Sequence, residues 1–344
     1  MLKYGYTSSG KQRWYCPRCK ITSIKTRTDL SKDKWERLLT HWLLSNTSLT
    51  ELSKTLKISK RSLGYKFNLV WQDLLKKEEF KTSHPETCVY DYPRIVILDA
   101  TYIKREYVVL IARDLEYVLG FAFYQKENYF SWYDFLIKLF PNPRLYPQVI
   151  VTDGKGGLIQ AINEIFGDKV KPQRCLFHIH LLSRVYLSLK PKTLAGKRLR
   201  SLIHQLSYVK TKRERYAWLL RFFLWFSYYQ PLLEEKVLEP MRRTKRGKPV
   251  WSYKNKKLRA AFSLIKNSLP YLFTFLDYPN VPHTTNHLEG GINARLKELI
   301  HRHRGLSREK QKILITLFLK SKMRKPTTTT NKKINYLIKS LTKL

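Results

Sequence analysis

Acidic residues are scarce in this chain, which has 26 Asp and Glu against 66 Lys and Arg. The resulting formal charge of +40 repels itself unless a polyanion neutralises it, and phosphate backbones are the usual partner. Basic residues recur from Lys3 to Lys343, so the charge is not confined to one tail. The composition favours a nucleic-acid partner, while a ribosome-associated or merely basic soluble protein is the alternative.

Cysteines and long apolar runs are also few. Two of the four cysteines form one Cys-x2-Cys pair, which is typical of a metal site in a reducing compartment and argues against a disulfide framework. The N-terminus has no apolar core of a signal peptide. The longest apolar stretch, residues 216–229, is short and carries Arg221, so it predicts a buried or amphipathic helix rather than a membrane span. We therefore expect a cytoplasmic protein.

The Cys-x2-Cys pair is Cys16 and Cys19. Such spacing places two thiolates on one tight turn and fits half of a tetrahedral zinc site, which usually needs four ligands. No second pair exists, and the other nearby candidates lie at poor spacings: His41, His84 and Cys88. The pair predicts a partial zinc site, or a remnant whose partner pair preceded Met1.

Residues 32–75 predict three helices. Apolar residues recur at helical spacing in residues 32–45, and Ser48 with Glu51 forms a capping box for the second helix. The third helix follows a short break at Ile58 and Ser59. Helix, helix, tight turn, helix is the helix-turn-helix pattern, in which the start of the last helix contacts the groove. We expect DNA contacts from Lys60, Arg61 and Ser62; a three-helix bundle with a charged face is the alternative.

After a polar linker the periodicity changes to that of strands. Strands are expected at Arg94–Leu98, Tyr107–Ala112, Tyr117–Phe123, Gln148–Thr152 and about Val170–Cys175, with helices at 130–140, 157–166 and about 178–190. This order of elements is that of the ribonuclease-H-like core. From about 184 to 280 the sequence predicts a basic helical region with a loop at 241–251, in which strand patterns stop. One more helix is expected at 284–305.

Two aspartates follow predicted strands directly. Asp99 comes after residues 94–98, and Asp153 comes after residues 148–152 and before a glycine-rich turn. Either one alone is also explained by the preference of Asp for strand ends and turns. Because the first and fourth strands are neighbours in a ribonuclease-H-like sheet, the two carboxylates can meet there. A hard divalent cation such as Mg²⁺ would neutralise them, and two ions would clamp the oxygens of an in-line phosphoryl transfer.

A third carboxylate is expected from the final core helix, where Glu289 lies. Asn286 and Glu289 are also spaced as a capping box, which is the alternative explanation. Gly290 and Gly291 follow, and each costs about 1 kcal/mol of helix propensity relative to Ala. Close approach of another backbone or of DNA would explain these glycines, whereas helix formation does not.

Three stretches of the chain resemble the catalytic blocks of Mutator-type insertion-sequence transposases. They are LDATYIKR at 98–105, VTDGKGGLIQAI at 151–162 with QRCLFHIH at 173–180, and TTNHLEGGINARLK at 284–297. Those enzymes are DDE transposases with a ribonuclease-H-like core, a helical insertion before the Glu, and a Cys-x2-His signature. The resemblance spans about residues 94–310. It implies Asp99, Asp153 and Glu289 as the triad that binds Mg²⁺ or Mn²⁺, as two ions.

The resemblance also assigns the Cys-x2-His signature to Cys175 and His178. His178 is expected in the active-site neighbourhood; metal ligation by the pair, or simple burial of Cys175, are the alternatives. Further DNA contacts are expected from a set of polar residues whose alternative is a solvated charge: Lys155, Arg174, Asn286, Asn293, Arg295, Arg302 and Arg304. The tryptophans of the insertion could stack on bases, but core packing is the better explanation, with Trp251 as the exception.

The resemblance gives the chain its expected organisation. The first 28 residues resemble half of a zinc ribbon, and the missing Cys-x2-Cys suggests a truncated or misassigned start. The expected segments are a partial zinc ribbon at 1–28, a helix-turn-helix domain at 29–80, a linker at 81–92, the core at 93–183 and 281–325, a helical insertion at 184–280, and a basic tail at 326–344. The fold class is α/β, with a ribonuclease-H-like mixed sheet.

The activity implied is DNA transposition in two steps, by a nucleoid-associated prokaryotic protein. Hydrolysis at the end of the element leaves a 3′-hydroxyl, which then attacks target DNA. The helix-turn-helix would bind terminal inverted repeats, and joining two ends requires a homodimer or a larger assembly. The alternatives are a ribonuclease-H-like nuclease and a catalytically inactive, transposase-derived DNA-binding regulator.

Overall fold

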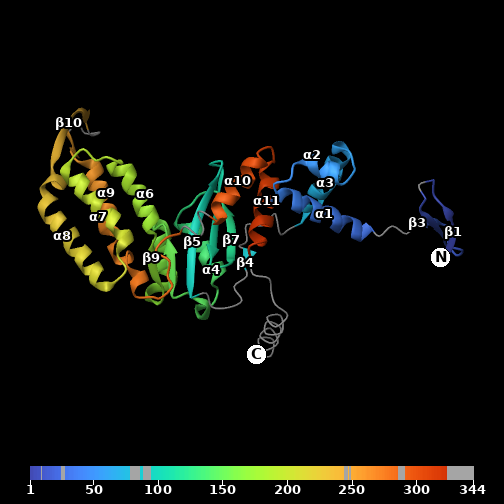
Figure 1. Ribbon diagram of the computed structural model, residues 1–344, viewed down its shortest axis with the longest axis horizontal. Helices are drawn as coiled ribbons and strands as arrows, with labels where there is room; N and C mark the ends of the chain where they lie inside the picture. The colour runs from blue at the N-terminus through green and yellow to red at the C-terminus, as the bar shows by residue number, and fades with distance from the viewer. Residues whose placement is uncertain are drawn as a thin grey trace. The chain divides into compact units, whose positions relative to one another are not determined.

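The chain divides into two compact units in the computed structural model, which describes residues 1–8, 10–24, 28–77, 86–87, 94–243, 247, 249–285 and 291–323. One unit comprises residues 1–82 and 299–318, and the other comprises residues 83–298 and 319–344. Figure 1 labels the elements of both. The segment boundaries expected from the sequence stay predictions.

The first unit begins with a small antiparallel sheet and continues as helices. The sheet contains β1 (Leu2–Tyr6), β2 (Gln12–Tyr15) and β3 (Thr22–Ile24), and the helices are α1 (Thr28–Leu44), α2 (Leu49–Thr55) and α3 (Lys60–Lys76). The capping box of α2 is present: the Ser48 hydroxyl accepts from the Glu51 backbone N–H, and Glu51 accepts from that of Ser48. The three helices expected at 32–75 are therefore confirmed.

The C-terminal part of the chain contributes to this first unit. Helices α10 (Ala294–Arg302) and α11 (Arg308–Lys320) begin in one unit and end in the other. The His303 ring hydrogen-bonds the Leu43 carbonyl at 3.1 Å and meets Trp42 edge-on. Burial lowers the pKa of His303, which favours the neutral ring at this contact.

The described strands of the second unit form a six-stranded sheet. Its spatial order is β4-β7-β6-β5-β8-β9, built from β4 (Glu86–Thr87), β5 (Ile95–Ile103), β6 (Tyr107–Arg113), β7 (Val118–Tyr124), β8 (Val149–Thr152) and β9 (Lys171–Arg174). β5, β6 and β7 form an antiparallel meander, whereas β8 and β9 run parallel to β5. A mixed α/β fold is thus confirmed.

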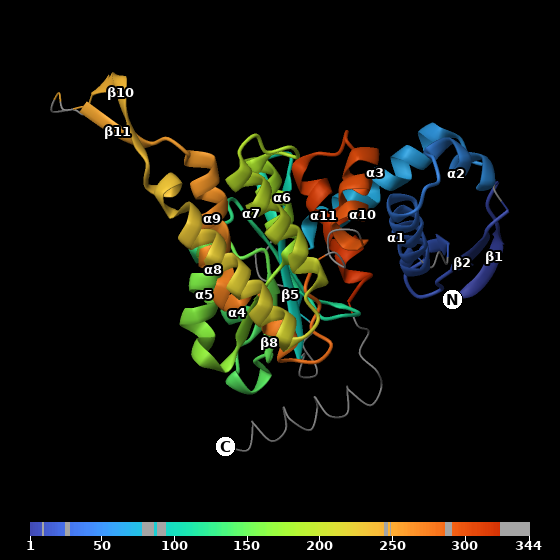
Figure 2. The ribbon, with the colours of Figure 1, turned by 60° about the vertical axis from the view of Figure 1, so that its left-hand side comes forward.

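Two helices cover one face of this sheet. α4 (Tyr129–Leu139) and α5 (Gly156–Phe166) lie beside it in Figure 2. Val96, Leu98 and Ile150 of the sheet pack on this side against apolar residues such as Trp132 and Leu158 of the helices. Because side chains alternate along a strand, the residues between them face the opposite side of the sheet.

Gly157 lets α5 approach the start of α4. A Cβ at this position would lie 2.8 Å from the Tyr129 nitrogen, a backbone atom that cannot rotate away. Gly157→Ala should therefore lower the free energy of unfolding by about 1–3 kcal/mol, the usual cost of overpacking. Gly156→Ala is the matched control, because a Cβ there meets nothing within 4 Å. Urea unfolding of both variants would measure the difference, and equal stabilities would contradict the close approach.

A helical bundle lies beside the β9 edge of the sheet (Figure 1). It contains α6 (Leu176–Leu187), α7 (Leu194–Gln205), α8 (Lys212–Glu234) and α9 (Lys256–Ser268). Trp218 and Trp225 are buried in the core of this bundle, and their indole N–H groups donate to the Leu202 and Ala195 carbonyls, so the packing explanation for these two is confirmed.

The second unit also contains short 3₁₀ turns, at Pro143–Leu145, Gly167–Lys169, Leu206–Tyr208, Leu269–Tyr271 and Thr274–Leu276.

The prediction that strands stop after residue 184 is wrong. β10 (Lys236–Arg243) and β11 (Pro249–Tyr253) form an antiparallel hairpin where a loop was expected at 241–251. The two strands pair through their backbones, which does not require an apolar face. Their charged residues interrupt the alternation of apolar and polar side chains from which a strand would be predicted. Trp251 of this hairpin is 62% exposed. This agrees with the expectation that Trp251, unlike Trp218 and Trp225, does not pack in the core.

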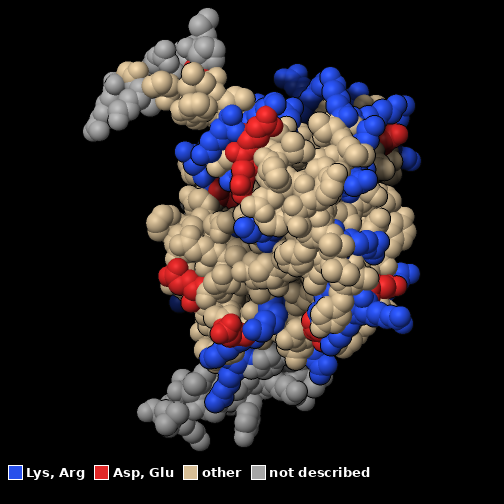
Figure 3. Space-filling model, turned by 90° about the vertical axis from the view of Figure 1, so that its left-hand side faces the viewer, with Lys and Arg blue, Asp and Glu red and all other residues tan. Residues whose placement is uncertain are grey.

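The outer side of α8 presents a broad, mostly uncharged area whose rim carries many Lys and Arg and fewer Asp and Glu (Figure 3). This helix contains the apolar stretch at 216–229. None of the helices in the described ranges is long and apolar enough to cross a membrane.

Candidate active site

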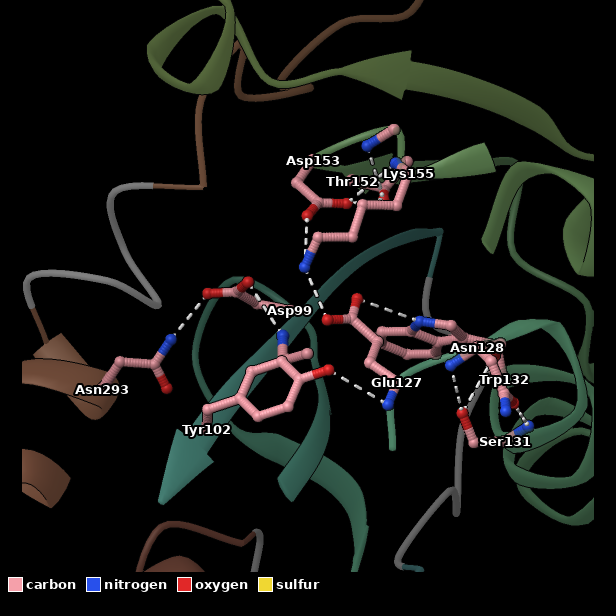
Figure 4. A network of polar contacts seen from close by, with 12 residues as sticks. Asp99, Tyr102, Glu127, Asn128, Ser131, Trp132, Thr152, Asp153, Lys155 and Asn293 are labelled. Carbon is pink, nitrogen blue, oxygen red and sulfur yellow. Dashed lines mark hydrogen bonds and ion pairs between the residues drawn. The ribbon is translucent and has the colours of Figure 1, made fainter. Parts of the chain in front are cut away.

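The register of two neighbouring strands brings Asp99 and Asp153 together. β5 and β8 pair Ile95 with Val149 and Ile97 with Val151, a constant offset of 54 residues. Asp99 and Asp153 are separated by the same 54 positions, and each lies two residues beyond the last pair of this register, so both stand at the same end of the strand pair. Alternation along β5 places Asp99 on the face opposite α4 and α5, and Asp153 begins the turn after β8. In Figure 4 their carboxylates turn toward one region.

The sequence placed Asp99 directly after the end of its strand, but in the structure Asp99 lies within the strand. β5 continues to Ile103, and Asp99 pairs with Ile111 of β6. Pairing between β5 and β8 stops at Ile97, because β8 ends at Thr152. Beyond Ile97, β5 is no longer paired with β8, and this open side gives access to the Asp99 carboxylate.

Asp99 is held in a polar contact within an apolar sheet. Its side chain is buried, with the residue 7% exposed. Oδ1 accepts from the Ala100 backbone at 2.8 Å, and Oδ2 accepts from the Asn293 amide at 2.6 Å. Asn293 is itself buried, on the helical turn before α10. Asn293 thus fixes the orientation of one catalytic candidate.

Asp153 is held by the turn that follows it. Its Oδ1 accepts from the Lys155 backbone at 3.1 Å and from the Thr152 hydroxyl at 3.4 Å. Gly154 has φ +70°, and a Cβ there would collide with the buried Arg174 side chain, which donates to the Gly154 carbonyl. Burial lowers the pKa of Arg174, and the charge of Asp153 opposes this shift. The expected sharp turn is confirmed, and Arg174 supports it.

Glu127 is a third acidic residue at this site, and no sequence pattern pointed to it. The Lys155 ammonium lies 2.5 Å from Glu127 Oε2 and 3.4 Å from Asp153 Oδ2 (Figure 4). The Glu127 side chain is 3% exposed, and its Oε1 accepts from the Trp132 indole at 3.3 Å. Burial lowers the pKa of Lys155, but Asp153 and Glu127 outweigh it and raise that pKa.

The signature cysteine ties the next block to the sheet. Cys175 is fully buried after β9, and its Sγ lies 3.2 Å from the Thr285 hydroxyl and accepts from the Thr285 backbone. His178 lies half-buried in the first turn of α6. Burial of Cys175 agrees with the simpler of the explanations given for it.

The described donors fit part of a divalent-cation site. Asp99 and Asp153 offer carboxylate oxygens at one end of the β5–β8 pair, and hard oxygen ligands suit Mg²⁺ or Mn²⁺. In the part of the chain that the structure describes, no three acidic, cysteine or histidine residues are grouped to hold a metal ion. The expected third ligand, Glu289, and its neighbour Asn286 lie outside the described residues.

A comparison with known families assigns the segment that contains this site. Residues 78–239 match the family model described as Transposase, Mutator family. The chain carries a Mutator-family transposase domain. The matched segment includes Asp99, Asp153 and the pair Cys175 and His178, and it ends before Glu289. A search of curated proteins found no match to the chain.

Outside the transposase domain, the Cys-x2-Cys pair stands in the turn between β2 and β3. The Lys20 backbone donates to the Cys16 carbonyl at 2.8 Å, which closes the turn. Hydrogen bonds from Cys19 and from the Arg18 backbone lower the pKa of the Cys16 thiol. A zinc ion at this knuckle stays a prediction.

The other residues expected to contact DNA are spread over both units. Lys60, Arg61 and Ser62 occupy the first turn of α3 and are exposed. Arg295 pairs with Glu298 at 2.6 Å, and Arg302 donates to the Ser45 carbonyl. Arg304 is exposed. DNA binding by each of them stays a prediction.

Proposed function

We propose that this transposase belongs to an insertion sequence, binds its terminal inverted repeats, and catalyses metal-dependent DNA cleavage and strand transfer. The observation that carries the proposal is that Asp99 and Asp153, both buried, each lie two residues beyond the last pair of the β5–β8 register, within the segment that matches the transposase family. Two buried acids at one end of the β5–β8 pair repel each other, and a divalent cation would neutralise them.

The order of elements supports a ribonuclease-H-like core. The chain runs β5, β6, β7, α4, β8, α5 and β9, with an antiparallel meander followed by two parallel strands. The helical region from α6 to α9 follows, before the segment that carries Glu289. This is the order in which the family places its insertion.

Chain reach supports Glu289 as the third ligand. Thr285 is bonded to Cys175 beside the β8–β9 strand ends, and Asn293 is bonded to Asp99. Glu289 is four residues from each of them, and four residues span at most about 14 Å. One anchor contacts Asp99 and the other contacts Cys175, whose backbone donates to the Thr152 carbonyl next to Asp153, and this supports Glu289 as the third ligand.

The residues of the chain have distinct roles in the proposed reaction. Asp99, Asp153 and Glu289 would hold two divalent cations, which activate the attacking oxygen and stabilise the leaving oxygen when bound. Asn293 orients Asp99, whereas Gly154 and Arg174 orient Asp153. His178 at the start of α6 would face the same substrate region.

DNA binding would use the basic surface around this centre. The charge of +40 supplies the non-specific attraction, and the exposed start of α3 supplies the groove contacts of a helix-turn-helix. Lys155, Arg295 and Arg304 would contact phosphates near the site, and Cys16 and Cys19 would form part of a zinc ribbon. We place the protein in the cytoplasm, on DNA.

A strand-transfer assay tests this function. A labelled, pre-cleaved end of the element is incubated with plasmid DNA and Mg²⁺ or Mn²⁺. Wild-type protein should join the end to the plasmid, and EDTA should abolish joining. Tight binding of the ends without joining would favour the regulator, and cleavage of DNA without regard to end sequence would favour the nuclease.

A further inference from the structure

Helix α8 is apolar on both of its faces. Its inner face packs into the helical core through Trp218, Phe222 and Trp225. From residue 216 to residue 233 the sequence contains one charged side chain, that of Arg221. A helix that is apolar all round is normally buried on every side. The outer face of α8 therefore fits a partner that the described residues do not supply.

The outer face carries a row of large exposed side chains, which we call the α8 stripe. Its members are 53–73% exposed and stand at helical spacing: Tyr216, Leu220, Phe223, Leu224 and Tyr228. Figure 3 shows this side of the molecule as a mostly uncharged area whose rim carries many Lys and Arg and fewer Asp and Glu. Contiguous apolar surface of this kind, with a polar rim, marks an interaction site.

The charge of the chain limits what can cover the α8 stripe. DNA requires Lys and Arg at its contact, and the stripe has none between its members apart from Arg221. Two copies of a chain with a charge of +40 repel each other, and a contact surface that carries almost no charge adds least to this repulsion. The α8 stripe is such a surface.

The order of side chains in the stripe is palindromic. Tyr216 and Tyr228 stand six residues before and after Phe222, and Leu220 and Leu224 stand two residues before and after it. In a two-fold contact, residue i meets residue j of the partner and j meets i. An antiparallel pair centred near Phe222 therefore brings tyrosine to tyrosine and leucine to leucine.

We propose that the α8 stripe is the interface between two copies of this chain, which cross antiparallel about a two-fold axis near Phe222. Four of the side chains follow one i±4 ridge, and interdigitated ridges of this type give the commonest crossing of packed helices. The proposal deepens the proposed function, since joining two DNA ends requires two copies, but its evidence comes from α8 alone.

The first test is the mass of the full chain in solution, by sedimentation equilibrium without DNA or metal. The wild type should be a dimer, and the double variant Leu220→Lys/Leu224→Lys should associate about 100-fold or more weakly, as expected for central interface residues. The matched control is Leu189→Lys/Leu194→Lys, two leucines with similar exposure in the α6–α7 region. Its dimer should be unchanged.

The second test is site-directed cross-linking, which reports orientation. Tyr216→Cys and Tyr228→Cys proteins are made with Cys16, Cys19 and Cys88 changed to Ser, and a short bis-maleimide is added. In the antiparallel pair, position 216 lies near position 228 of the partner, whereas two copies of position 216 lie about 18 Å apart along the axis. Mixing the two proteins should give a covalent dimer, and either protein alone should not.

The inference is overturned by a monomeric wild type, by a Leu220→Lys/Leu224→Lys dimer as tight as the wild type, or by binding of the stripe to phospholipid vesicles in place of a second copy. Cross-linking of each cysteine variant alone would overturn the antiparallel orientation. Neither test of the interface needs catalysis. A dimer that does not carry out strand transfer would contradict the proposed function and leave this inference intact. A monomer that joins DNA ends would refute this inference and leave the proposed function intact.

Discussion

Asp99→Asn and Asp153→Asn should each reduce strand transfer by about 10³-fold or more, with the sheet intact. The proposed site predicts this loss, because each variant removes a charged oxygen that would bind the cation, and cation stabilisation of several kcal/mol corresponds to a factor of this size. Asparagine at position 99 has one acceptor oxygen, so it can keep either the contact with the Asn293 amide or the contact with the Ala100 backbone. Rates with Mg²⁺ on a labelled pre-cleaved end measure the effect.

Thermal unfolding should separate the two variants. Removing either charge relieves repulsion between the carboxylates, but Asp153 also offsets the buried charge of Arg174. Asp99→Asn, which loses one hydrogen bond, is therefore expected to be more stable than Asp153→Asn without metal. Asp168→Asn is the matched control, since Asp168 is exposed in the same domain. Full activity in either active-site variant would refute the site.

Lys155→Met should tighten Mn²⁺ binding by about 10-fold or more, and Glu127→Gln should weaken it by a similar factor. The Lys155 ammonium lies between the carboxylates of Asp153 and Glu127 and would repel an incoming cation. The Glu127 carboxylate would attract the cation, as it attracts Lys155. A unit charge at 4 Å is worth about 4 kcal/mol near a protein surface, and half-exposure of Lys155 reduces this toward the 1.4 kcal/mol of a 10-fold change.

Isothermal titration with Mn²⁺, without DNA, measures these affinities apart from activity. Glutamine keeps an oxygen for the Trp132 indole, so the Glu127 loop retains its contact. Lys126→Met is the matched control, because it removes the same charge from an exposed neighbour of Glu127. If the Lys155 and Glu127 variants both bind Mn²⁺ as the wild type does, Lys155 has no influence on the metal and only its DNA contact remains as a role.

Local sequence rules predicted most elements of this fold. The strand and helix order of the second unit, the capping box of Ser48 and Glu51, and the burial of Trp218 and Trp225 all depend on periodicity and near neighbours. The β10–β11 hairpin was missed because its pairing is between backbones, and its side chains lack an alternating apolar face.

The site was predictable only where a strand pattern pointed to it. Asp99 and Asp153 follow apolar runs, so the sequence found them, although Asp99 lies within β5 because β6 continues to pair with it. Glu127 was missed because its contact with Lys155 spans 28 residues and depends on how the loop before α4 meets the turn after β8. Nothing in the local sequence encodes that meeting.

The first unit is assembled from two separate stretches of the chain, residues 1–82 and 299–318. Its N-terminal helices hold His303 against Leu43 and Lys310 over Trp71. During synthesis those contacts cannot form until residue 310 has left the ribosomal tunnel, by which time the whole transposase domain has been translated. A chain that stops before residue 299 would lack this packing.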